Sequence, residues 1–156
     1  MALIVHATTV SLNGTGVLIR GGSGAGKSDL ALQLLETAGN GLTNANIATV
    51  LVADDQTALT VEGDQLYAAA PSTIRGLLEV RGQGIVKVPS REHVKVVLVV
   101  DLKPAAEIER MPEEALMRTD ILGVSLPHIE IDASKPSSVR HVRVSVCTRQ
   151  KLLKPS

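Results

Sequence analysis

The chain has 156 residues, a length that fits one domain with one core, and 44% of them are hydrophobic, as is usual for a globular protein. Lys plus Arg and Asp plus Glu each number 16, and the resulting net charge of zero argues against a general nucleic-acid binder, which would be basic. Aromatic residues make up only 1%, so the core must be built from Val, Leu, Ile and Ala, and the stacking platforms of single-strand binders are missing.

The sequence also carries information on compartment and membrane association. No apolar run reaches the ~20 residues that span a bilayer, and the opening Met1–Val5 is too short for a signal-peptide core and has no basic leader. The single cysteine, Cys147, cannot form an internal disulfide, which fits a reducing compartment. We therefore expect a cytoplasmic protein with no membrane or nucleic-acid partner, and a single domain over residues 1–156.

The first part of the chain predicts two strands, a glycine-rich loop and a helix. A strand is expected over Leu3–Leu12, a turn over Asn13–Gly16, and a short apolar strand over Val17–Arg20. Ser28–Ala38 has helical spacing, and Gly39–Gly41 is expected to end that helix. The apolar stripe of the helix consists of Leu30, Ala31, Leu34 and Leu35.

The middle of the chain predicts mostly strands. Ile47–Ala53 and Val94–Leu102 are nearly continuous apolar runs, as expected of buried strands covered on both faces. Leu59–Glu62 and Gln65–Ala69 flank a Gly-Asp turn and predict a hairpin. Glu79–Val88 contains an unusual cluster of charged residues and glycines.

The last part of the chain is less regular. Lys103–Arg118 is polar and interrupted by proline, which favours short helices or loop, and Ile129–Ile131 is expected to form a last short strand. Val139–Val146 fits either a strand or a helix. Strands and helices are mixed rather than strictly alternating, so we expect an α/β domain with a mixed sheet and flanking helices.

A phosphate-binding motif lies between the strand Val17–Arg20 and the first helix. The pattern G-x-x-x-x-G-K-[ST] is matched by Gly21, Gly26, Lys27 and Ser28. Glycines allow successive backbone N–H groups to curl around an anion, and the following helix directs its positive dipole end at the phosphates. Lys27 is expected to reach the outer phosphates of ATP, and the Ser28 hydroxyl to bind Mg²⁺. The expected nucleotide contacts are Gly21, Gly22, Ser23, Gly24, Ala25, Gly26, Lys27 and Ser28.

Two further clusters contain candidate catalytic side chains. Asp54 and Asp55 end a buried strand, where one acid could hold magnesium while the other accepts a proton; a solvated pair opening a turn is the alternative. Glu79 could complete a metal shell and Arg81 could offset phosphate charge, although from this segment alone a surface ion pair beside a loop is the commoner arrangement. Taken alone, His6 reads as a packed core residue and Arg91 as a solvated one.

Together these pieces resemble the catalytic domain of HPr kinase/phosphorylase, a P-loop kinase family with a fold like that of PEP carboxykinase. The members phosphorylate a serine of HPr, the small phosphocarrier of the sugar phosphotransferase system. The resemblance is carried by His6 and by the segments Gly16–Ile19, Gly21–Ser28, Ala53–Asp55, Ala70–Pro71, Leu78–Ile85 and Arg91–Glu92. The string Glu79–Ile85 is close to a family signature.

The resemblance implies a role for each matched residue. Lys27 would contact the transferred phosphate, Ser28 and Glu79 would bind Mg²⁺, and Asp55 would support the metal. Asp54 would be the base that takes the serine proton. His6 and Arg91 would be active-site groups near the phosphates. By the same resemblance we expect a homohexamer that acts on an HPr-like carrier with ATP and Mg²⁺.

The chain also departs from the family pattern. It opens at the kinase domain, like the short form found in α-proteobacteria, whose partner would be an HPr-like carrier serving nitrogen or global regulation. Ser137–Val139 stands where the family shows Gly-Arg-Asn, a region tied to phosphorolysis, so reversal of the reaction is left open. Two alternatives also remain: a P-loop small-molecule kinase, and a non-catalytic regulatory module that responds to ATP.

Overall fold

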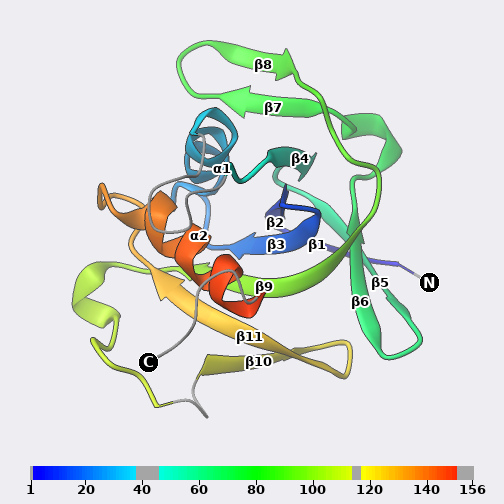
Figure 1. Cartoon of the computed structure of the whole chain (residues 1–156). Helices are drawn as coiled ribbons and strands as arrows, with labels where there is room; N and C mark the ends of the chain where they lie inside the picture. The colour runs from blue at the N-terminus through cyan, green and yellow to red at the C-terminus, as the bar shows by residue number, and fades with distance from the viewer. Residues whose placement is uncertain (1, 38–45, 114–116, 151–156) are drawn as a thin grey trace.

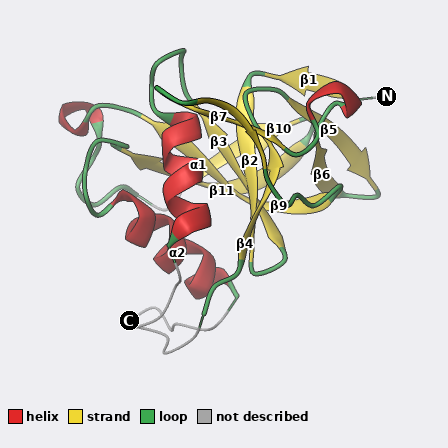
Figure 2. Cartoon of the chain, turned by 90° about the horizontal axis from the view of Figure 1, so that it is seen from above, coloured by secondary structure: helices red, strands yellow, loops and turns green. Residues whose placement is uncertain are grey.

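The protein folds around one curled, mixed sheet with helices on one side (Figures 1 and 2). The structure, a computed structural model, describes residues 2–37, 46–113 and 117–150. The first elements are β1 (Leu3–Val5), β2 (Ala7–Leu12), β3 (Thr15–Arg20), α1 (Lys27–Glu36) and β4 (Thr49–Ala53). Then follow β5 (Thr57–Glu62), β6 (Gln65–Ala69), β7 (Leu77–Val80), β8 (Gly84–Lys87), β9 (Val94–Leu102), β10 (Arg118–Ile121), β11 (Val124–Ile131) and α2 (Ser138–Arg149). Short 3₁₀ turns cover Ser72–Ile74 and Ala105–Glu107.

The strand order of the main sheet is β1-β5-β6-β9-β3-β2-β4, with β11 on β9 and β10 on β11. β3, β9 and β11 are parallel neighbours, whereas β2 is antiparallel to both β3 and β4. β4 therefore runs in the same direction as β3. The carboxyl ends of β4, β3, β9 and β11 and the start of β2 consequently share one edge of the sheet, which is where ligands bind in α/β folds.

Aliphatic residues fill a core on each side of this sheet. Leu30, Ala31 and Leu34 of α1 and Val142 and Val146 of α2 are buried against β3 and β9 on the helix side. On the other side, residues of β2, β3, β5, β6, β9 and β11 pack together where the sheet curls over itself. The mixed α/β fold with flanking helices is thus confirmed, and its cores contain the aliphatic residues that the composition demanded.

Several predicted elements differ from the observed ones. The strand expected over Leu3–Leu12 is broken at His6 into two strands that pair with different neighbours. The helix begins at Lys27, and its expected end at Gly39–Gly41 lies outside the described residues. The ambiguous Val139–Val146 is helical.

Other differences concern strand lengths. The unusual Glu79–Val88 cluster lies in the hairpin of β7 and β8, which begins earlier, at Leu77, and is a separate two-stranded sheet above α1 (Figure 1). The strand expected over Ile129–Ile131 starts earlier, at Val124, and its partner β10 was not predicted. No helix within the described residues is long and apolar enough to cross a membrane.

Candidate active site

The glycine-rich segment forms a tight loop between β3 and α1. Gly24 and Gly26 have φ values of 80° and 99°, in the left-handed region that side chains other than glycine disfavour. A Cβ on Gly21 would lie 3.0 Å from Ala25 Cβ and 3.2 Å from Leu102 Cβ, so this glycine allows close packing. The loop has the strand-to-helix context that the motif requires.

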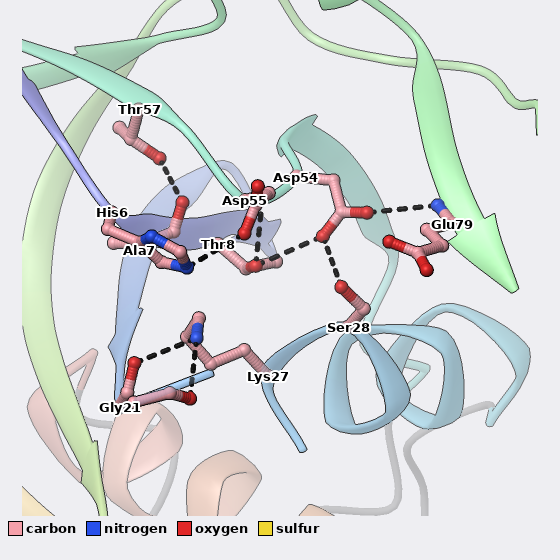
Figure 3. A network of polar contacts seen from close by, with 11 residues as sticks. His6, Ala7, Thr8, Gly21, Lys27, Ser28, Asp54, Asp55, Thr57 and Glu79 are labelled. Atoms are coloured by element: carbon pink, nitrogen blue, oxygen red, sulfur yellow. Dashed lines mark hydrogen bonds and ion pairs between the residues drawn. The ribbon is translucent and has the colours of Figure 1, made fainter. Parts of the chain in front are cut away.

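Lys27 is buried at the start of α1, with only 6% of its surface exposed. Its Nζ donates to the carbonyl oxygens of Gly21 at 2.7 Å and Gly22 at 3.0 Å (Figure 3). The ammonium is therefore folded back on the loop, where a phosphate oxygen could replace these carbonyls. A buried charge needs such partners, because desolvation otherwise disfavours it.

Asp54 lies just beyond the end of β4 and is also 6% exposed. Its Oδ1 accepts hydrogen bonds from Ser28 Oγ at 2.6 Å and Thr8 Oγ1 at 3.1 Å, and its Oδ2 accepts one from the Glu79 amide at 2.9 Å. These donors come from α1, β2 and β7, so one carboxylate connects three elements (Figure 3). The bond to Ser28 brings the glycine loop and the acid together.

Asp55 points away from Asp54 although the two are adjacent. Its side chain is 60% exposed and its Oδ1 lies 2.8 Å from Nε2 of His6, in the break between β1 and β2. The expectation that His6, taken alone, is a packed core residue is therefore wrong, because 55% of its side chain is exposed. The strand break places His6 beside the acids.

Glu79 lies beside Asp54 and Ser28, whereas the side chain of Arg91 does not contact the acids. Glu79 is exposed, and Figure 3 shows its carboxylate turned toward Asp54 and Ser28. The amide of Arg91 donates to Leu51 O at 2.8 Å, which fixes its backbone beside β4, while its side chain is exposed. Within the described residues, the guanidinium groups of Arg91 and Arg81 make no hydrogen bond or ion pair with the acids. The structure thus gathers His6, Lys27, Ser28, Asp54, Asp55 and Glu79, and leaves these two arginines at the periphery.

The oxygen atoms of Ser28, Asp54, Asp55 and Glu79 suit magnesium, which takes hard oxygen ligands. Among the described residues, no group of three His, Cys, Asp or Glu side chains forms a metal cage. Magnesium at a nucleotide site needs none, because it keeps several waters and is shared between one or two carboxylates and the phosphates. The donor set therefore fits Mg²⁺ bound together with a nucleotide.

The opposite flank of the glycine loop is formed by the ends of β9 and β11. A Cβ on Gly26 would lie 3.2 Å from Ala133 Cβ, so the segment after β11 packs against the loop. Hydrogen bonds from the Ser134 hydroxyl and amide, and then from the Ala105 amide, hold the pKa of Asp132 below its ordinary value. These hydrogen bonds connect the segment after β9 to the segment after β11, and both segments flank the glycine loop.

A polar residue that sequence analysis missed is Thr8. It is fully buried, and its hydroxyl contacts the carboxylate of Asp54, 46 residues further along the chain. The sequence offers only a threonine in a strand, where threonine is common. No local signal could have distinguished it from its neighbour Thr9.

A glycine loop follows β3 at the carboxyl edge of the mixed sheet, and an acid follows β4, the next strand along the chain, at the same edge. This arrangement is typical of α/β domains that bind phosphates. Comparison with known proteins narrows this class. The model of the HPr Serine kinase C-terminal domain family matches residues 1–154, and the chain belongs to this family.

Similar proteins include the HPr kinase/phosphorylases of Exiguobacterium sp. (40% identical over 107 residues), Geobacillus kaustophilus (36% over 138) and Mycoplasmopsis pulmonis (33% over 146). These alignments cover 64%, 81% and 86% of the chain but only 31%, 41% and 44% of the relatives, so the chain spans less than half of their length. The solved Hpr(Ser) kinase/phosphatase of Coxiella burnetii matches with a TM-score of 0.75 and 25% identity, covering 96% of this chain and 97% of that one.

Proposed function

We propose that this chain is a kinase domain that transfers a phosphoryl group from ATP, with Mg²⁺, to a serine of an HPr-like phosphocarrier protein. The observation that carries the proposal is the bond between Ser28 and Asp54, which joins the glycine loop to a buried acid at the same sheet edge. Family membership supports the acceptor class, because the similar proteins bear the names HPr kinase/phosphorylase and Hpr(Ser) kinase/phosphatase.

In this proposal the side chains act on different parts of the reaction. Loop amides and Lys27 hold the phosphates, and Lys27 exchanges its carbonyl partners for phosphate oxygens. The serine oxygen forms the new bond to the γ-phosphorus while the bond to the ADP oxygen breaks. Asp54 takes the serine proton, and the transfer otherwise depends on positioning and charge stabilisation.

Magnesium, when bound, would neutralise the phosphate charge, and its candidate ligands are Ser28, Asp55 and Glu79. Ser28 and Glu79 lie beside Asp54, whereas Asp55 faces His6 and would have to turn from it to reach the metal. His6 lies within hydrogen-bonding distance of Asp55 and would orient it. Arg91 is assigned to the phosphates only by family resemblance, and reaching them would require its exposed side chain to turn inward.

The reverse reaction, phosphorolysis of the serine phosphate, is not part of the proposal. Ser137 is the residue that precedes α2, and Ser138 is its first residue and is buried. Neither can supply the positive charge of the Gly-Arg-Asn segment that the family has there. We expect the kinase direction to dominate.

The proposed donor is ATP, so a cytoplasmic location follows as part of the same proposal.

Two alternative functions, a small-molecule kinase and a non-catalytic regulatory module, predict different uses of ATP. We would incubate the protein with γ-³²P-labelled ATP and Mg²⁺, adding an HPr-like carrier, a mixture of small metabolites, or neither. Label on the carrier supports the proposal, label on a metabolite favours the first alternative, and bound but unconsumed ATP favours the second.

A further inference from the structure

The side chain of Thr8 connects the two acids of the candidate site. Its Oγ1 accepts a hydrogen bond from the Asp55 amide at 3.2 Å and lies 3.1 Å from Oδ1 of Asp54. A carboxylate can only accept, so the single hydroxyl proton of Thr8 must be donated to Asp54. One buried oxygen thus holds both the backbone of Asp55 and the carboxylate of Asp54.

The backbone between the acids is strained. Asp55 has φ 66°, and the Gln56 amide donates to the Asp54 carbonyl at 2.7 Å, two residues back, which closes a γ-turn. This turn is rare with a positive central φ in residues other than glycine, and surrounding contacts must maintain it. The bond from the Asp55 amide to Thr8 is such a contact.

The turn gives the adjacent acids opposite surroundings. Asp54 is 6% exposed and faces Ser28, whereas the Asp55 side chain is 60% exposed and faces His6. Adjacent side chains of an extended strand also point to opposite faces, but the chain would then continue along β4. The γ-turn instead bends the backbone directly after Asp54, and the Thr8 hydroxyl holds the Asp55 amide at this bend, so the directions of both acids depend on that contact.

We propose that Thr8 is a positioning residue that holds Asp54 inward as the proton acceptor and Asp55 outward toward His6. The inference rests on the proposed kinase function and adds a residue to it. Thr8 touches neither nucleotide nor acceptor in this account, because it acts through the two acids.

The neighbouring residue Thr9 is a matched control. It is also fully buried in β2, but its hydroxyl lies 2.9 Å from Thr57 Oγ1 and contacts no acid. Thr57 donates its own proton to the Ala7 carbonyl, so Thr9 is the donor in that pair. Thr8→Val and Thr9→Val each remove one buried hydroxyl of the same size from the same strand.

The test compares Thr8→Val, Thr8→Ala, Thr8→Ser and Thr9→Val in steady-state phosphorylation of the carrier, with thermal melting of each variant. We expect Thr8→Val and Thr8→Ala to lower kcat about tenfold or more, the effect of losing one hydrogen bond to a charged group, with KM for ATP nearly unchanged. Thr8→Ser should recover most of kcat, and Thr9→Val should melt like Thr8→Val yet keep kcat. Wild-type kcat in Thr8→Val or Thr8→Ala, or no recovery in Thr8→Ser, overturns the proposal.

A second readout does not need activity. Hydrogen exchange of the Asp55 amide should accelerate by about tenfold or more in Thr8→Val but not in Thr9→Val, because only the former loses the acceptor of this N–H. Unchanged exchange in Thr8→Val also overturns the proposal. If the wild type phosphorylates no carrier while this exchange pattern holds, the kinase function fails and the role of Thr8 in the turn stands.

Discussion

At the scale of single residues, Lys27 and Asp54 are both nearly buried, and each charge is satisfied without the other. Lys27 is bonded to two loop carbonyls and Asp54 to three donors. The site is therefore stable without a ligand, and nucleotide binding must exchange these contacts for phosphate and metal contacts. Because Asp54→Ala also leaves three donors without their acceptor, thermal melting of that variant must be measured beside transfer.

Lys27→Ala should lower kcat/KM for phosphoryl transfer by an amount equivalent to ~2–4 kcal/mol, the size typical of losing one key electrostatic group. The ammonium is the group that would balance charge on the transferred phosphate. Steady-state kinetics measures the loss. Lys95→Ala, which changes an exposed lysine of β9, is the control and should have no effect.

Asp54→Ala should also lower transfer by ~2–4 kcal/mol, because the serine hydroxyl loses its proton acceptor. Asp64→Ala serves as the comparison, since Asp64 lies in the exposed turn between β5 and β6. Transfer rates in Asp54→Ala that match the wild type would contradict the role of Asp54 as the base.

His141 on α2 gives a pH-dependent prediction. Partial desolvation lowers the pKa of this surface-exposed histidine, so the unfolded chain, with an ordinary value of about 6.5, binds the proton more readily than the folded one. Stability is therefore lost as pH falls below about 6.5. Urea unfolding at pH 7.5 and 5.5 should show a smaller acid loss in His141→Gln than in the wild type. An equal loss in both proteins would remove His141 as a cause.

At the scale of elements, the helix α2 shows where sequence patterns were insufficient. Val142, Val144 and Val146 alternate as in a strand, but the structure has a helix in which Val142 and Val146 are fully buried and Val144 is not. The same valines satisfy both periods over so short a segment. Packing against α1 and the sheet selects the helix, and this information is not local.

The helical assignment predicts unequal effects of truncation. Val142→Ala should destabilise the protein by roughly 1–3 kcal/mol, because it leaves a cavity in the core. Val144→Ala should cost less than half of that. A strand would place both residues on one face and give equal effects. Urea denaturation of the two variants separates these outcomes.

Elements that are specified by neighbouring residues could be predicted from the sequence. The glycine loop, the first helix, the β5–β6 hairpin and the buried run that becomes β9 all follow from neighbouring residues. Thr8, the break at His6 and the β10–β11 hairpin depend on partners far along the chain. The γ-turn at Asp55 could not be foreseen, because aspartate does not specify a positive φ.

At the scale of the whole molecule, the strand order assembles the site. β4 ends beside the start of β2, and β2 pairs with β3, so Asp54, His6 and the glycine loop meet at one sheet edge. The hairpin of β7 and β8 joins this edge through the Glu79 amide. The site therefore exists only when the sheet is complete.

The oligomer expected from the family resemblance is also a property of the whole molecule. By family resemblance we expect a homohexamer, that is, six chains of 16.4 kDa. Analytical ultracentrifugation at micromolar concentration should report this mass. A species that sediments as a single chain would contradict the proposed assembly without affecting the kinase site.

Phosphorylation of the carrier itself tests the central claim most directly. An HPr-like carrier is incubated with the protein, ATP and Mg²⁺, and its intact mass and modified residue are determined by mass spectrometry, with Lys27→Ala in parallel. We predict one added phosphate, on a serine, that is absent with Lys27→Ala. An unchanged carrier mass, while ATP still binds the wild-type protein, would contradict the assignment as a protein-serine kinase.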